Sequence, residues 1–151
     1  MICAVLSADC LPLLLCDKKG SQVAALHLGW RGIAAGLINS AIGSFTCSAT
    51  DLVAWIGPHI RQRNYETGAD VYEIFHERDP GTDPAFVSSG EGKWLLSLAQ
   101  LVEYELGKNG VSGIYDCKAC TYARPQHFFS YRRQNITGRM ASLIWIDSTG
   151  I

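Results

Sequence analysis

The sequence has few charged residues and no long apolar segment. Charged residues make up 18% of the 151 residues, below the roughly 25% of an average domain, and 13 Lys and Arg nearly balance 14 Asp and Glu. This balance lacks the basic excess with which proteins bind nucleic acids or anionic membranes, so we expect neither partner. No run of 18 apolar residues is present, so we expect no membrane span. Hydrophobic residues amount to 48%, which excludes disorder as the main state.

A disulfide framework is not expected from the cysteines. The sequence contains six cysteines and has no pattern of a secretory signal at its start, so we predict free thiols in a reducing, cytoplasmic compartment. Cys117 and Cys120 have the CxxC spacing of half a zinc site or of a redox pair. No second CxxC accompanies them, and coincidence is the preferred interpretation.

The hydrophobic pattern predicts one α+β domain. Apolar runs between turn residues predict short buried strands over 2–6 and 12–16 and further strands over 22–27, 52–56, 112–116, 127–132 and 139–146. Helical spacing predicts helices over 33–42, 68–77 and from Leu95 to Leu106, and residues 78–93 have the Gly and Pro content of a long surface loop. Strands near both ends with about three helices between them indicate a layered mixed sheet.

A thiol and an imidazole are predicted to lie at the same end of two paired strands. Cys10 lies at a bend before one strand, and His27 ends the strand that would pair with it through a turn at 18–21. Three interpretations are open: a buried Cys with a core His, a thiolate nucleophile with His27 as its base, or two ligands of a zinc ion. A catalytic zinc normally has three protein ligands, and His59 and His127 are weaker candidates for the third.

Arginines form a second candidate feature. Arg31 begins a predicted helix directly after a Gly-Trp turn, where helix N-termini favour anions. Arg132, Arg133 and Arg139 lie close together near the C-terminal end and present forked donors suited to phosphate or carboxylate. The alternative is a solvated hairpin tip whose arginines reach across a sheet edge.

Five motifs in order resemble those of the YfiH family, also called the laccase-domain or multicopper polyphenol oxidase family. The first two are Ser7-Ala8-Asp9-Cys10-Leu11-Pro12 and His27-Leu28-Gly29-Trp30-Arg31-Gly32. The others are Gly57-Pro58-His59-Ile60 with Tyr65-Glu66-Thr67-Gly68, then Cys120-Thr121-Tyr122, then Phe128-Phe129-Ser130-Tyr131-Arg132-Arg133 through Thr137-Gly138-Arg139. Together they extend over the whole sequence.

This resemblance implies a fold shared with cysteine-hydrolase-like toxin deamidases and a zinc site of one Cys and two His. Cys10 and His27 would be two of the ligands. In the family the other His belongs to a QVH segment upstream of the first motif, and this sequence has no such segment. We therefore expect residues 1–151 to form a single laccase-like domain that is truncated at its N-terminus. Apolar surface and an open sheet edge near residues 2–6, with poor metal binding, would follow.

The resemblance also implies purine nucleoside chemistry. The leading hypothesis is a zinc-dependent purine nucleoside phosphorylase and adenosine deaminase that also cleaves methylthioadenosine, with purine nucleoside and phosphate as its ligands. Arg31, Arg132, Arg133 and Arg139 would be candidates for the phosphate. The family label implies copper and polyphenol oxidation, but four histidines without an HxH repeat cannot supply several copper ions.

Two alternatives to the phosphorylase remain. One is a zinc-free Cys-His hydrolase that edits peptidoglycan precursors. The other is an inactive binding module that lacks its first His ligand.

Overall fold

A four-stranded mixed sheet forms the centre of the protein. The computed structural model describes residues 2–147, and its central strands are β2 (Leu11–Asp17), β3 (Val23–Leu28), β4 (Leu52–Ile56) and β8 (Gly113–Asp116). They are ordered β3-β2-β4-β8. The β4–β8 pair is parallel and the other pairs are antiparallel, which confirms the predicted mixed sheet.

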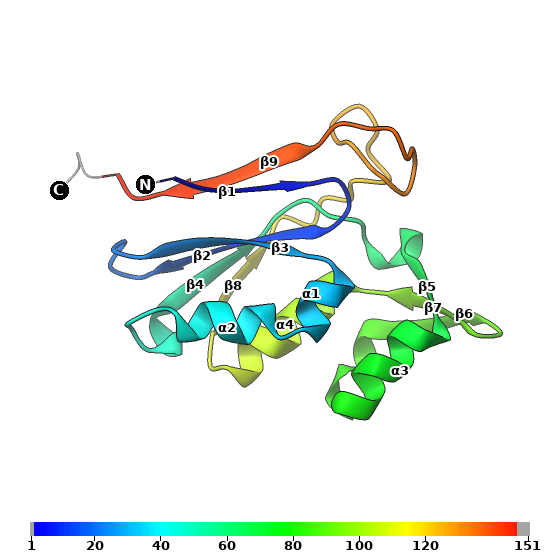
Figure 1. Cartoon of the computed structure of the whole chain (residues 1–151), viewed down its shortest axis with the longest axis horizontal. Coiled ribbons are helices and arrows are strands. Elements are labelled where there is room, and N and C mark those ends of the chain that lie inside the picture. The colour runs from blue at the N-terminus through cyan, green and yellow to red at the C-terminus, as the bar shows by residue number, and fades with distance from the viewer. Residues whose placement is uncertain (1, 148–151) are drawn as a thin grey trace.

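Helices cover one face of this sheet. They are α1 (Trp30–Ala34), α2 (Leu37–Gly43) and α4 (Leu98–Lys108), which lie below the strands in Figure 1. Alternation along β2 directs Leu11, Leu13 and Leu15 into the core, where each is fully buried. The opposite face carries the intervening Pro12, Leu14 and Cys16.

A two-stranded ribbon lies over that opposite face (Figure 1). Strand β1 (Ile2–Ser7) pairs antiparallel with β9 (Met140–Trp145), so the two ends of the described chain lie side by side. The prediction of a buried first strand is wrong, because alternate residues of β1 face solvent. Ile2, Leu6 and Trp145 are 65%, 59% and 58% exposed, so the expected apolar surface near residues 2–6 is present.

A third, antiparallel sheet adjoins helix α3 (Ala69–Arg78). It consists of β5 (Glu66–Gly68), β7 (Lys93–Leu96) and β6 (Phe86–Gly90), in the order β5-β7-β6. Short 3-10 helices lie at Ala49–Asp51, Gln62–Asn64 and Pro80–Ala85. The long loop predicted over 78–93 is therefore wrong, because this segment holds one of those turns, all of β6 and the start of β7.

Three other predicted elements differ from the structure. The helix over 33–42 is split into α1 and α2 by Gly36, whose φ of 78° is left-handed. Leu95 belongs to β7 rather than to the following helix, and residues 127–132 form turns and irregular structure instead of a strand. Within the described residues, no helix is long and apolar enough to cross a membrane.

Candidate active site

The turn between β1 and β2 places Cys10 beside the end of β3. In the β2–β3 hairpin Leu11 pairs with Leu28 and Pro12 with His27, so Cys10 lies next to the Gly29 turn. A Cβ atom at Gly29 would be 3.0 Å from the Cys10 sulfur, so any larger residue there would press on the thiol. Cys10 and His27 line the same cavity, as the hairpin prediction required.

Backbone contact orients the His27 ring. Its Nδ1 lies 2.8 Å from the carbonyl oxygen of Leu6. A carbonyl can only accept a hydrogen bond, so Nδ1 carries a proton, and in the neutral ring the lone pair is on Nε2. Metal-binding histidines commonly have this arrangement, in which a backbone carbonyl fixes the tautomer.

Asp9 joins distant segments of the chain beneath this turn. It is buried, and its carboxylate accepts hydrogen bonds from Thr121 Oγ1 at 2.6 Å, Ser130 Oγ at 3.0 Å and the Arg132 backbone N–H at 2.6 Å. Its φ of 102° is in the left-handed region, which Asp tolerates better than most residues. Asp9 thereby holds residues 121–132 against the turn that carries Cys10. We assigned Asp9 no role from the sequence.

Three of the four predicted arginines line the Cys10–His27 cavity. Arg31, Arg132 and Arg139 border this space of about 450 Å³, together with Tyr65. The Arg132 guanidinium lies 5.2 Å from the centre of the Tyr65 ring and donates to the Glu66 carbonyl. Arg31 stacks 4.3 Å from the Trp30 ring. The cavity therefore combines a thiol, an imidazole, three cations and the Asp9 carboxylate.

Arg133 lies outside this cavity, contrary to the prediction. Its guanidinium donates to the carbonyl oxygens of Thr121, Tyr122 and Phe128 at 2.7–2.9 Å. These bonds close the loop after β8 onto itself. Sequence spacing could not distinguish this structural arginine from its neighbour Arg132.

Burial keeps the protons on two groups of the cavity. Burial raises the pKa of the Cys10 thiol, Asp9 raises it further, and Arg139 acts in the opposite direction. Burial, and then the nearby Cys10, raise the pKa of Tyr65 to about 12. Tyr65 is therefore a neutral phenol beside the thiol, and its place in the cavity was not predicted.

The family of the chain follows from comparison with known proteins. The family model of the multi-copper polyphenol oxidoreductase laccases matches residues 1–147. The chain belongs to this laccase family. A protein of Escherichia coli K12 named purine nucleoside phosphorylase YfiH is 43% identical over 145 residues, and a Pseudomonas aeruginosa protein named purine nucleoside phosphorylase is 39% identical over 146.

Solved structures of related proteins have the same fold. A Neisseria meningitidis protein matches 97% of the chain with a TM-score of 0.95 and 44% identity, and Geobacillus stearothermophilus YlmD matches 95% with a TM-score of 0.89 and 27% identity. The predicted fold class is thus confirmed. The chain spans 59% of the E. coli relative and 61% of the N. meningitidis chain.

The other histidines of this laccase-family chain do not join Cys10 and His27. His59 is buried, donates from Nδ1 to the Gly57 carbonyl and accepts at Nε2 from Arg61, so both ring nitrogens are engaged. Burial lowers the pKa of His59 to about 4. His76 pairs with Asp83 at the surface.

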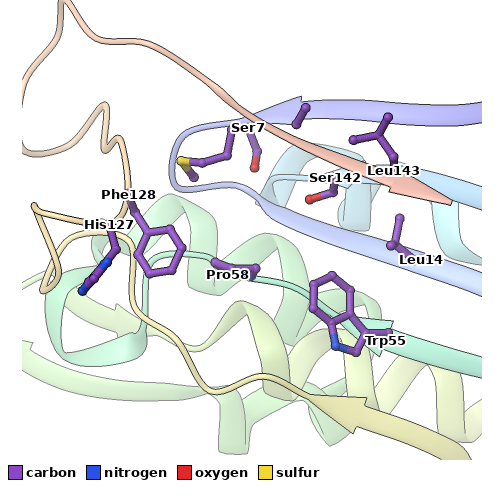
Figure 2. A pocket seen from close by; sticks show the side chains of 10 residues that line it. Ser7, Leu14, Trp55, Pro58, His127, Phe128, Ser142 and Leu143 are labelled. Carbon is purple, nitrogen blue, oxygen red and sulfur yellow. The ribbon is translucent and has the colours of Figure 1, made fainter.

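His127 lies in a different cavity, between the β1–β9 ribbon and the central sheet (Figure 2). The walls of this cavity include Phe128, Trp55 and Leu14. The buried Ser7 hydroxyl, which has no hydrogen-bond partner within residues 2–147, borders the same space. His127 is therefore not a third ligand beside Cys10 and His27 in this structure.

Cys10 and His27 are suitable zinc ligands, but two ligands are fewer than a protein zinc site needs. A thiolate and an imidazole with a fixed tautomer are typical zinc ligands. Within residues 2–147, however, no group of three or more His, Cys, Asp or Glu side chains could hold a metal ion. The histidines are also too dispersed to form the several copper sites that the family label implies.

Proposed function

We propose that this chain forms the larger part of a zinc-dependent purine nucleoside phosphorylase. The observation that supports the proposal is the cavity that Cys10 and His27 line together with Arg31, Arg132 and Arg139. Relatives at about 40% identity are named purine nucleoside phosphorylases. Cys10 and His27 would supply two zinc ligands, and the third would come from outside the described residues. Zinc in such a site acts as a Lewis acid.

The side chains of the cavity suit phosphate and nucleoside. Arg31, Arg132 and Arg139 would hold inorganic phosphate through charge-assisted hydrogen bonds. In phosphorolysis a phosphate oxygen attacks C1′ of the ribose, the C1′–N9 bond breaks, and its electron pair leaves with the purine, which takes up a proton. Tyr65 would donate a hydrogen bond to the nucleoside, since its phenol stays neutral at every pH of interest. We further propose that the same cavity deaminates adenosine and cleaves methylthioadenosine. We also propose that the protein is cytoplasmic.

The zinc-free thiol hydrolase is the weaker candidate. A cysteine nucleophile needs a lowered pKa, whereas burial and the Asp9 carboxylate raise that of Cys10. A metal ion would remove the thiol proton, so the raised pKa is compatible with ligation.

Purine release from inosine tests the proposal. Release should require inorganic phosphate and zinc in the longest natural form of the polypeptide. Cys10→Ala and His27→Gln should each lower kcat at least a hundredfold, while Cys47→Ala, remote from the cavity, should not. Turnover that persists in Cys10→Ala, or in zinc-free protein, would contradict it.

Equilibrium dialysis of the 151-residue chain against zinc tests whether Cys10 and His27 bind the metal without a third ligand. Because one ligand is lacking, retention should be weaker than micromolar. Stoichiometric retention by these residues would instead show that the chain completes its own site, and would exclude the inactive binding module.

A further inference from the structure

A second cavity, of about 530 Å³, shares no residue with the Cys10–His27 cavity. Its walls come from the turn after β4, from the loop after β8 and from the β6–β7 hairpin. The lining residues are Arg61, Gln62, Arg63, Asn64, Val87, Leu95, Lys118, Cys120, Ala123 and Arg124. Four of these ten side chains are basic and none is acidic.

Part of the positive charge in this cavity is not neutralised by the protein. Arg61 donates both terminal nitrogens to one Asp116 oxygen at 2.8 Å. Within residues 2–147 no salt bridge joins a carboxylate to Arg63, Lys118 or Arg124. Lys118 lies in the field of the Glu103 carboxylate, and its backbone N–H donates to Asp116, so the free positive charge of this cavity comes mainly from Arg63 and Arg124. In a chain of net charge −1, two such cations at one concave space attract anions.

The cavity also contains a thiol that the protein holds as a hydrogen-bond acceptor. The Cys120 sulfur lies 3.5 Å from the Arg61 backbone N–H and 3.3 Å from Asn64 Nδ2. Partial burial acts to raise the pKa of Cys120, but the hydrogen bonds from Arg61, Ala123, Asn64 and Tyr122 outweigh it and lower the pKa. A cysteine with a lowered pKa in a basic cavity is typical of reactive cysteines.

We propose that Cys120 is a thiol–disulfide exchange site for acidic, low-molecular-weight disulfides. The Cys120 thiolate attacks one sulfur of the disulfide, the S–S bond of the ligand breaks, and the second half leaves as a thiolate. The product is a mixed disulfide on Cys120, and no further oxidant is needed. Arg63, Lys118 and Arg124 bind the carboxylates of the ligand and raise its local concentration.

Oxidised glutathione is the probe, because carboxylates outnumber its ammonium groups, and bis(2-hydroxyethyl) disulfide is its uncharged control. The native chain is treated with each at pH 7, and adducts are located by peptide mass spectrometry. We expect one glutathionyl adduct, on Cys120, forming roughly tenfold faster than the neutral adduct at low salt. Added salt should remove this preference.

Variants test separately how the basic side chains and the Cys120 thiol contribute to adduct formation. Arg63→Gln combined with Arg124→Gln, both at exposed positions, should lower the glutathione rate roughly tenfold and leave the neutral rate unchanged. Cys120→Ser should abolish the adduct, and Cys117→Ser should retain it. An adduct on the more exposed Cys117, or a glutathione rate that ignores the two arginines, would overturn the proposal.

Discussion

Cys10 and Cys120 are both partly buried thiols in arginine-lined cavities, yet their surroundings act in opposite directions. Cys10 lies beside the Asp9 carboxylate, and its pKa is raised first by burial and then by that charge. Cys120 has no carboxylate in its cavity and receives hydrogen bonds on sulfur, so its pKa is lowered despite burial. Nearby arginines therefore do not decide the state of a thiol. The depth of burial, the acid beside the thiol and the donors that reach the sulfur do.

The largest expected effect comes from Asp9→Asn. The amide cannot accept all three hydrogen bonds that the carboxylate receives, so the free energy of unfolding should fall by roughly 3 kcal/mol in a urea titration. Removing the negative charge should also lower the pKa of Cys10 and bring the two thiols closer in reactivity. Asp51→Asn, at an exposed position, is the control and should change stability by less than about 0.5 kcal/mol. Equal stability of the two variants would contradict the role given to Asp9.

Arg133→Lys tests whether Arg133, which lies outside the Cys10 cavity, stabilises the loop after β8. An ammonium cannot reach three carbonyls at once, so the unfolding free energy should fall by about 1–2 kcal/mol. Arg139→Lys serves as the control, because the Arg139 guanidinium contacts carbonyls only of Thr137 and Gly138. The assignment fails if Arg139→Lys is the more destabilising change.

The smallest effect is expected from Asn64→Ala, measured by iodoacetamide alkylation resolved by site. Because only thiolates react, Cys120 should be alkylated at lower pH than Cys10, whose raised pKa delays its ionisation. Losing the Asn64 donor raises the pKa of Cys120, so its rate at pH 7 should fall roughly threefold. Asn135→Ala, at an exposed position, should leave the rate unchanged. Identical pH profiles of alkylation for Cys10 and Cys120 would contradict the opposite pKa shifts of the two thiols.

Local patterns were sufficient for the elements around the site. The β2–β3 hairpin follows from its apolar runs and Gly turn, and strand Leu52–Ile56 was predicted with its observed bounds. Prediction failed over 78–93, since Pro and Gly there open a 3-10 turn and a hairpin instead of a loop. It also failed for β1, whose alternate exposure depends on pairing with β9.

The sequence by itself determined the β2–β3 hairpin, which brings Cys10 and His27 to one cavity, because the pairing of a hairpin depends on a short local segment. It also determined the family, because the motifs can be read from the residues in their order along the chain. Tertiary structure alone decided which arginines share the Cys10 cavity, because Arg132 and Arg133 are adjacent in sequence but point into different surroundings. It also decided that Asp9 bonds to Thr121 and Ser130, over a hundred residues away. The lowered pKa of Cys120 likewise depends on donors from Arg61 and Asn64, which only the packed loops bring to its sulfur.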